Sequence, residues 1–334
     1  MVSILDILKM PNKRAQFKLK SLMTSFIEIQ FYSYSAESGL MKELLQPTKK
    51  SDLIKSMRIK NVELFEHVLN LGLSLEAISC KNGKYNLKAS LAKAMANSSG
   101  DPLSSMMKEM VHYHGDVFRN LSQNLNHLLQ KDYLGEFGEV VAESSRIIEP
   151  FIKNFIFTLL VPTETYHILE IGCGSGEYFK YYFERNAKNT GIGIDYNANV
   201  VKKAKMNLSN EIYSSNFQIQ CVDIRNPNKV LGGTFSIITS FQNIYYFNTT
   251  ERQSLFVDLF SNLKKGGRFA LLSVFPGKKP LSPYFDIILS STKGCHPVPD
   301  KGTIIEERTL AGFKEIKKTR LIPGEELWGI VALK

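Results

Sequence analysis

A series of short apolar runs is the feature that most limits how this chain can fold. From Tyr166 onward these runs are separated by stretches long enough for helices, and they read HILEIG, TGIGID, FQIQCVD, FSIITS and RFALLSV. Short continuous apolar runs spaced in this way are typical of buried parallel strands. The pattern therefore predicts a doubly wound α/β sheet in the C-terminal half of the chain.

The pattern of apolar residues changes after Gly312, and this change predicts how the sheet ends. The runs FKEIKKTRLI and LWGIVALK flank Pro323 and Gly324, a pair that favours a turn. They indicate a terminal hairpin that adds one antiparallel strand to an otherwise parallel sheet.

A glycine-rich segment closes the first apolar run and precedes a predicted helix. It reads Glu170-Ile171-Gly172-Cys173-Gly174-Ser175-Gly176. Glycines let the backbone turn tightly and approach a ligand that a Cβ atom would exclude. A nicotinamide-binding loop is the competing interpretation, but its usual pattern is GxGxxG, whereas this segment has GxGxG with an acid two residues before the first glycine.

Two aspartates end the next two apolar runs and decide between these interpretations. Asp195 follows GIGI, at a place where a carboxylate can accept hydrogen bonds from both ribose hydroxyls of an adenosine ligand. Asp223 ends the third run, from which an acid can reach an adenine amino group. The sequence here resembles the class I S-adenosylmethionine-dependent methyltransferases, whose motifs are an acidic GxGxG loop, a ribose acid and an adenine acid.

The resemblance implies a role for each of these residues. Glu170 is the acid of the loop, and Gly172, Gly174 and Gly176 line the methionine and ribose end of S-adenosylmethionine. Asp195 holds the ribose and Asp223 the adenine amine, while Tyr196 and Ile224 flank the adenine ring. For each aspartate taken singly, the alternative is a residue that merely ends a strand or begins a helix.

The N-terminal third of the chain has a different pattern of apolar residues, which is typical of helices. Residues 15–45 have apolar positions at helical spacing, with Gly39 as a break. Then SDLIKSM and NVELFEHVLNLGLSLEAI predict two short helices, and KNGKYNL predicts a hairpin around Asn82-Gly83, which is the order of a winged helix. Glu63 and Glu66 on the recognition helix would repel phosphates, so the pattern favours an association module over a DNA reader.

A winged-helix module, a helical bridge and a C-terminal methyltransferase domain together resemble the two-domain small-molecule O-methyltransferases, over nearly the whole chain from about residue 20. The segment KNGKYNL also matches the wing of that family closely. The resemblance implies a winged-helix-like dimerisation domain at 1–100, a helical bridge at 101–160 that contributes to the substrate pocket, and a cofactor-binding methyltransferase domain at 161–334. It also implies a homodimer that acts on a small molecule.

The chain departs from this family at the general base. Relatives carry a histidine after the fourth strand, and counting back from Gly266-Gly267 places Tyr245 at that position, followed by Tyr246 as a substrate contact. A phenol with a pKa of ~10 is a poor proton acceptor at neutral pH. We therefore expect S-, N- or C-methylation, which needs little or no base, or a non-standard O-methylation.

Other residues of the bridge are candidates for the acceptor site. His112 and His114 could replace the missing base, with Tyr113 between them and Arg146 as further substrate contacts. The ordinary alternative for His112 and His114 is a partly exposed pair on a helix, and for Arg146 it is a surface or ion-paired arginine. His296 lies in a loop sequence, GCHPVP, without further support.

Charge and cysteine content limit the partners. The net charge is +10, but it is spread along the chain rather than gathered in one basic block, which disfavours nucleic acid. The four cysteines lack CxxC spacing, which indicates reduced thiols in the cytoplasm and no metal site. No apolar run approaches the ~18–20 residues of a membrane span, and we expect no secretory signal.

Two alternative functions remain at this stage. One is an RNA or protein methyltransferase, which the dispersed charge disfavours. The other is a non-catalytic S-adenosylmethionine-binding regulator that uses a winged helix to bind DNA, which Glu63 and Glu66 disfavour.

Overall fold

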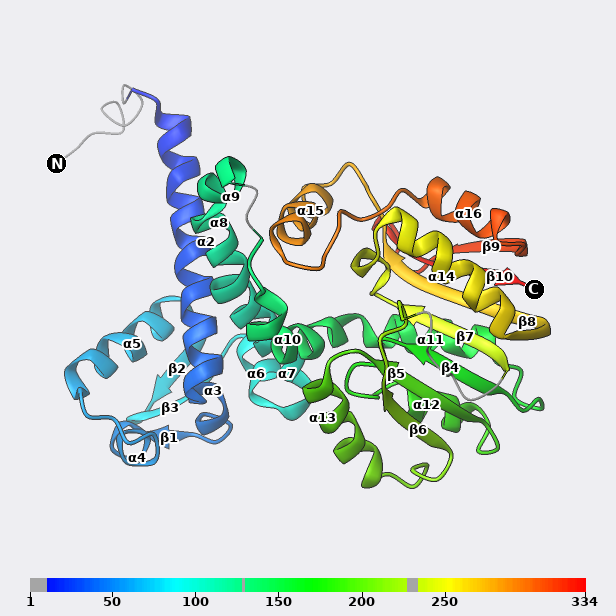
Figure 1. Cartoon of the computed structure of the whole chain (residues 1–334). Helices are drawn as coiled ribbons and strands as arrows, with labels where there is room; N and C mark the ends of the chain where they lie inside the picture. The colour runs from blue at the N-terminus through cyan, green and yellow to red at the C-terminus, as the bar shows by residue number, and fades with distance from the viewer. Residues whose placement is uncertain (1–10, 128–129, 227–233) are drawn as a thin grey trace. The chain divides into compact units, whose positions relative to one another are not determined.

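The computed structural model describes residues 11–127, 130–226 and 234–334 (Figure 1). Its Cα positions divide the chain into two compact units. The N-terminal unit runs to residue 119 and includes 143–147, and the C-terminal unit comprises 120–142 and 148–334. Each unit is described by itself below.

The C-terminal unit contains one seven-stranded sheet in the order β6-β5-β4-β7-β8-β10-β9. All neighbouring strands from β6 to β8 are parallel, whereas β10 pairs antiparallel with both β8 and β9. This confirms the predicted parallel sheet and its terminal hairpin. The strands are β4 His167–Ile171, β5 Thr190–Asp195, β6 Phe217–Cys221, β7 Phe235–Phe241, β8 Leu263–Val274, β9 Lys314–Arg320 and β10 Leu327–Leu333.

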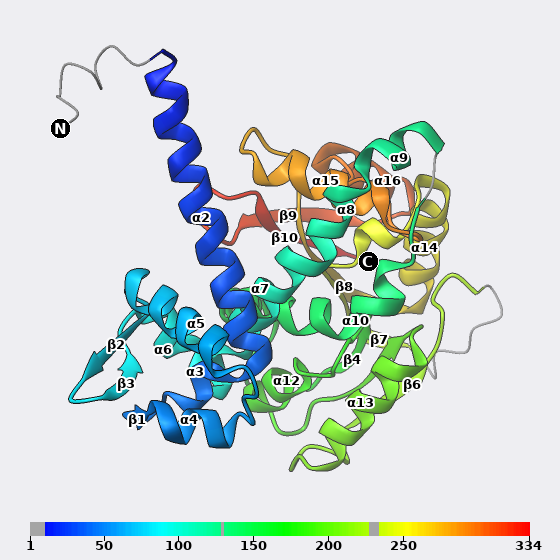
Figure 2. The same cartoon turned by 90° about the vertical axis from the view of Figure 1, so that its left-hand side faces the viewer.

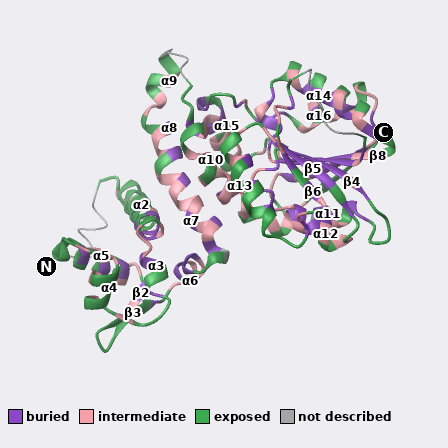
Figure 3. Ribbon diagram, turned by 60° about the horizontal axis from the view of Figure 1, so that its bottom comes forward, coloured by how far each residue is buried: buried purple, intermediate pink, exposed green. Residues whose placement is uncertain are grey.

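Helices cover both faces of this sheet, so its apolar runs are buried on both sides (Figure 3). One core joins the sheet to α11 Glu149–Leu159, α12 Phe179–Arg185 and α13 Ala198–Ser209. The other core joins it to α14 Thr249–Asn262, α15 Leu281–Ser291 and α16 Lys301–Leu310. The three layers place the carboxyl ends of β4, β5 and β6 along one edge, where the glycine-rich segment and both aspartates follow their strands.

Strand β8 begins earlier than the apolar run RFALLSV indicates. It starts at Leu263, which pairs with Phe235, and the register shifts between Phe235 and Ile237. Gly266 takes a φ of 74°, a left-handed conformation that favours glycine, at this irregular place. The polar residues around it do not follow the apolar pattern of a buried strand, which explains the difference.

The N-terminal unit is built around the long helix α2, Lys13–Ser38, which ends at Gly39 with a φ of 76° before the short helix α3, Leu40–Glu43 (Figure 2). This confirms the predicted helix and its break. Next come β1 Thr48–Lys49, α4 Lys50–Ser56, α5 Val62–Ser74, β2 Ile78–Lys81, β3 Lys84–Leu87 and α6 Ser90–Ala96. Strands β2 and β3 form the predicted hairpin, with Asn82 and Gly83 at positive φ values of 51° and 73° in its turn.

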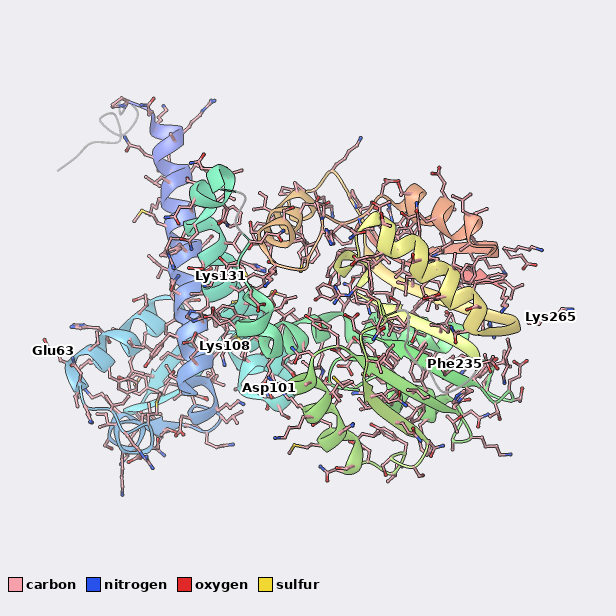
Figure 4. The ribbon with its side chains drawn as sticks, in the orientation of Figure 1. Glu63, Asp101, Lys108, Lys131, Phe235 and Lys265 are labelled. Atoms are coloured by element: carbon pink, nitrogen blue, oxygen red, sulfur yellow. The ribbon has the colours of Figure 1, made fainter. Side chains whose placement is uncertain are left out.

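The carboxylates of α5 are exposed. Glu63 lies in the first turn of the helix (Figure 4), and Glu66 forms an ion pair with Lys50 at 3.0 Å. The helix therefore presents acidic side chains to solvent, as its sequence predicts.

Between residues 98 and 160, the described residues form successive short helices that are divided between the two units. They are η1 Ser98–Gly100, α7 Asp101–Lys108, the π-helical segment η2 Glu109–His114, α8 Gly115–Arg119, α9 Leu121–His127, α10 Tyr133–Ser144, η3 Ser145–Ile148 and α11. Within the described part of the chain, no helix has the length and apolar character needed to cross a membrane.

Candidate cofactor site and active site

The glycine-rich segment after β4 adopts a backbone that requires glycine. Gly172, Gly174 and Gly176 have φ values of 62°, 53° and 76°, all in the left-handed region. A Cβ atom at Gly172 would lie 2.5 Å from Asn243 Nδ2, whereas one at Gly174 would meet nothing within 4 Å. The loop is thus packed on one side and leaves open space for a ligand beside Gly174.

A cavity of about 240 Å³ lies at the carboxyl ends of β4, β5 and β6. It contains the expected Gly172, Asp195, Tyr196, Asp223, Ile224 and Tyr246, but not Gly174 or Gly176, and two other segments contribute Asp132 and Lys293-Gly294. The complete lining is Asp132, Ile171, Gly172, Ile194, Asp195, Tyr196, Val222, Asp223, Ile224, Arg225, Asn243, Tyr246, Phe247, Lys293 and Gly294.

Asp195 connects the glycine loop to β5. Its Oδ2 accepts a hydrogen bond from Gly174 N at 3.2 Å, and its Oδ1 accepts one from Asn197 N at 3.0 Å. Burial raises the pKa of this carboxyl group, while the backbone N–H donors oppose the rise. The carboxylate is therefore held in a fixed orientation at the cavity wall.

Asp223 is held by a residue that the sequence interpretation did not identify. Arg225 Nε donates to Asp223 Oδ1 at 2.9 Å, and Arg225 Nη2 donates to Oδ2 at 2.8 Å. The guanidinium also lies 5.7 Å from the centre of the Tyr196 ring. Arg225 occurs two residues after a predicted ligand acid, but nothing in the sequence pattern distinguishes it from other surface arginines.

Glu170 does not line this cavity. Its side chain is buried in the core, with the residue only 1% exposed. Burial raises the pKa of its carboxyl group to about 8, although a hydrogen bond with Tyr182 lowers that pKa in part. Tyr182 in turn forms a hydrogen bond with Thr239 at 3.1 Å. Burial therefore favours the neutral, protonated form of the Glu170 carboxyl group.

Tyr245 lies in the short 3₁₀ turn Ile244–Tyr246 after β7. It is buried, and its ring makes edge contacts with Tyr246 at 4.9 Å and with Phe285 at 5.4 Å. The turn is fixed by Asn243, whose Nδ2 donates to Ile171 O at 2.5 Å, and by His296, whose backbone N donates to Tyr245 O at 2.8 Å. Tyr246 reaches the cavity wall from this turn, whereas Tyr245 is not among the lining residues.

Two segments that are far apart in the sequence contribute Asp132 and Lys293 to the cavity. Lys131 N donates to Ser291 O at 3.2 Å, and Lys293 N donates to Lys131 O at 2.9 Å. Gln130 Nε2 adds a hydrogen bond to Ser290 O at 2.9 Å. These pairings fix a second wall of the site, which no local sequence pattern indicates.

The bridge candidates belong to the N-terminal unit. His112 Nε2 lies 2.5 Å from Glu37 Oε1, and His114 Nε2 lies 3.1 Å from Glu109 Oε1. Arg146 pairs with Glu143 at 3.0 Å.

Residues 109–114 form a π-helical segment that contains His112, Tyr113 and His114. It places Tyr113 against His114, with ring centres 5.0 Å apart. Ser144 also donates to the buried carboxylate of Glu109, so the unit contains a polar cluster that sequence reasoning missed.

Comparison with known proteins extends this description. Residues 168–267 match a family model described as a methyltransferase domain. No curated protein matches the chain.

Solved structures resemble this one along almost the full chain. Human N-acetylserotonin methyltransferase in complex with SAM has 15% sequence identity, a TM-score of 0.77 and coverage of 98% of this chain and 99% of its own. An O-methyltransferase family protein from Burkholderia thailandensis has 13% identity, a TM-score of 0.78 and coverage of 100% and 98%. The mitomycin 7-O-methyltransferase MmcR has 10% identity, a TM-score of 0.78 and coverage of 96% and 98%.

The residues at the cavity fit S-adenosylmethionine. Gly172 borders the cavity with its backbone, and the Asp195 and Asp223 carboxylates in the cavity wall are the acceptors that an adenosine group needs. The matched domain spans β4 to the start of β8, which carry these groups. The chain therefore contains a methyltransferase domain at residues 168–267, within a fold that it shares with the solved methyltransferases named above.

Proposed function

We propose that this enzyme transfers a methyl group from S-adenosylmethionine to a small-molecule acceptor. The observation that carries the proposal is the cavity at the strand ends, whose wall includes Gly172 of the glycine loop and the two fixed carboxylates of Asp195 and Asp223. When bound, the cofactor supplies an electrophilic methyl group on a sulfonium. The similar structures include enzymes named for N-acetylserotonin and for the 7-oxygen of mitomycin. Both names refer to small molecules, which supports a small-molecule acceptor here.

The chain's own residues bind and orient the cofactor in this proposal. Asp195 accepts hydrogen bonds from the ribose hydroxyls, Asp223 accepts one from the adenine amine, and Tyr196 and Ile224 flank the adenine ring. Gly172, Gly174 and Gly176 admit the methionine and ribose portions. Glu170 lies in the core, where it forms a hydrogen bond with Tyr182 and does not contact the cofactor.

Binding of S-adenosylhomocysteine is expected to raise the melting temperature, because any ligand of the native state does so, whereas NAD is expected to have no effect. Asp195→Ala should weaken binding by about 1–3 kcal/mol, since the ribose hydroxyls lose their acceptor. Calorimetric titration measures the affinity, and Asp52→Ala on the exposed surface of α4 is the control. Unchanged affinity in Asp195→Ala would remove this residue from the site.

For the accepting atom we propose sulfur, nitrogen or carbon, or an oxygen that is activated in a non-standard way. Tyr245 occupies the position of the usual histidine and, as a phenol with a pKa of ~10, is a poor base at neutral pH. Its buried ring, packed between Tyr246 and Phe285, shapes the site. His112 and His114 are the alternative bases, and Tyr113, Arg146 and Tyr246 are the proposed contacts of the acceptor.

Tyr245→Phe is expected to retain most of the activity, and Tyr245→His is not expected to raise turnover on the native acceptor. The physical reason is that methyl transfer to a good nucleophile depends on in-line positioning rather than on proton removal. Steady-state turnover with labelled cofactor, after the acceptor has been found by untargeted metabolomics, measures both variants. A loss of ~10²-fold or more in Tyr245→Phe, with cofactor affinity intact, would instead identify the phenol as a general acid or base.

We further propose a cytoplasmic homodimer that is held by the N-terminal unit as a winged-helix dimerisation module. Helix α2 exposes a group of large apolar side chains, each more than half exposed, which are Phe17, Leu19, Leu22, Met23 and Phe26. A second copy of the same helix would remove this surface from water. Cys80 and Cys221 are exposed free thiols, which suits a reducing compartment.

Light scattering at micromolar concentration is expected to give the mass of a dimer, and the double variant Phe17→Glu/Phe26→Glu is expected to give the mass of a monomer. Charges on this face prevent its burial against a second copy. Ile212→Glu is the matched control, because Ile212 is 85% exposed but lies in the C-terminal unit. A wild-type monomer would reject the dimer.

A further inference from the structure

The ion pair between Asp223 and Arg225 has a geometry that a loose surface pair lacks. Besides the two side-chain hydrogen bonds described above, Arg225 Nε lies 3.2 Å from Asp223 Oδ2, and the backbone N of Arg225 donates to Oδ1 at 3.0 Å. Both side chains line the cavity. One residue thus fixes both oxygens of the carboxylate, and with them the plane of the group.

A contribution to the folding stability of the protein does not by itself account for the ion pair between Asp223 and Arg225. The side chains of Arg225 and Asp223 are 35% and 42% exposed, and solvent-exposed ion pairs contribute little to folding. A fork of two parallel N–H donors does, however, restrict the orientation of a carboxylate strongly. The guanidinium itself is restrained by the Tyr196 ring beneath it, which is a proposed adenine contact.

We propose that Arg225 is a positioning residue for adenine recognition, and that it acts by holding the Asp223 carboxylate in the orientation that accepts a hydrogen bond from the exocyclic amine. This inference rests on the proposed role of Asp223. Each carboxylate oxygen can accept more than one hydrogen bond, so a ligand amine can share the carboxylate with Arg225. Because an ionised carboxylate only accepts, the site selects a base that carries an amine and disfavours one that carries a carbonyl oxygen at the same place.

The experiment compares the affinity of two ligands that differ at this one group. S-Adenosylhomocysteine has the amine, and S-inosylhomocysteine has a carbonyl oxygen in its place. Wild type is expected to prefer the adenine ligand by roughly tenfold or more, the range for a hydrogen bond to a charged group. Calorimetric dissociation constants for both ligands give the preference as a ratio.

In Arg225→Ala this ratio is expected to fall to about threefold or less, mainly because the adenine ligand binds more weakly. Arg225→Lys keeps the charge but lacks the fork, so its ratio should also fall. Arg320→Ala is the matched control, since Arg320 pairs with Glu326 at 2.9 Å and lies 4.8 Å from the Trp328 ring, at the opposite edge of the sheet. The control should keep the wild-type ratio.

A double-variant cycle separates positioning from general damage to the site. Asp223→Asn is expected to lower the ratio by itself, and adding Arg225→Ala to it should lower the ratio no further, because Arg225 acts through Asp223. If the two losses simply add, Arg225 does not act through Asp223 and the inference fails.

Three further outcomes overturn the inference in distinguishable ways. A wild-type ratio near one, or an Asp223→Asn variant that keeps the ratio, would remove Asp223 from adenine recognition, and the inference would fall with that part of the proposed function. A normal Asp223→Asn response with an unchanged Arg225→Ala ratio would remove Arg225 alone. Tighter adenine binding in Arg225→Ala would show that the guanidinium competes with the ligand.

Discussion

Replacement of Arg252 by methionine is expected to lower the free energy of unfolding by about 3–5 kcal/mol, because breaking a buried ion pair leaves an uncompensated charge. Arg252 on α14 is 5% exposed. Its Nε and Nη2 donate to the two carboxylate oxygens of Glu307 on α16, at 3.0 and 2.9 Å. Nη1 donates to Phe247 O at 3.0 Å, so the same side chain also anchors a residue of the cavity wall.

Arg308, the next residue on α16, is expected to respond in the opposite direction. It is fully buried, and among the residues that the structure describes no group accepts a hydrogen bond from its guanidinium. Its charge lies against the Phe269 ring, 4.8 Å from the ring centre. Burial lowers the pKa of Arg308 to about 9, so it remains charged at neutral pH. Arg308→Met should raise the free energy of unfolding by roughly 1–4 kcal/mol.

Urea unfolding of the two single variants and the double variant measures these effects. In the Arg252→Met background, Arg308 becomes the adjacent counter-charge of Glu307, so removing it there should destabilise the protein rather than stabilise it. This reversal of sign is the sharpest form of the prediction. If Arg308→Met destabilises the wild type by 1 kcal/mol or more, the guanidinium has an acceptor and its burial is compensated.

The sheet of the C-terminal unit can be predicted because short segments of the sequence are enough to mark its strands and its turn. The parallel strands coincide with short apolar runs, and the terminal hairpin is marked by Pro323 and Gly324. The same holds for the glycine loop, since a left-handed backbone at Gly172, Gly174 and Gly176 leaves few other residue choices. In the N-terminal unit, Asn82-Gly83 specifies its hairpin for the same reason.

Other parts of the site depend on which distant segments meet, and the sequence does not show this. Asp132 and Lys293 reach the cavity only because residues 130–131 pair with residues 290–293. Glu170 has the spacing of a ligand acid, yet its side chain is buried in the core beside Tyr182. The difference between Arg252 and Arg308 depends on which of them reaches Glu307, and both look alike in an amphipathic helical pattern.

The stability of the protein is expected to depend on pH through Glu170. The pKa of its carboxyl group is about 8 in the folded protein against an ordinary value of 4.5, because burial disfavours the charged form. Between these two values the folded state binds the proton and the unfolded state does not. The free energy of unfolding should therefore fall as pH rises from about 4.5 to 8, by a total of about 5 kcal/mol from this group.

Glu170→Gln should remove this dependence, because an amide does not titrate. Relative to wild type, the variant is expected to gain stability steadily between pH 5 and pH 8 and then to keep a constant advantage. A buried amide carries its own hydrogen-bonding cost of about 1–3 kcal/mol at every pH, so the decisive quantity is the change with pH rather than the absolute difference. Glu211→Gln, at an exposed position, is the control and should follow the wild-type profile. Parallel profiles for wild type and Glu170→Gln in urea unfolding from pH 5 to 9 would mean that Glu170 is ionised in the folded core, and its partner there would have to be a cation rather than Tyr182.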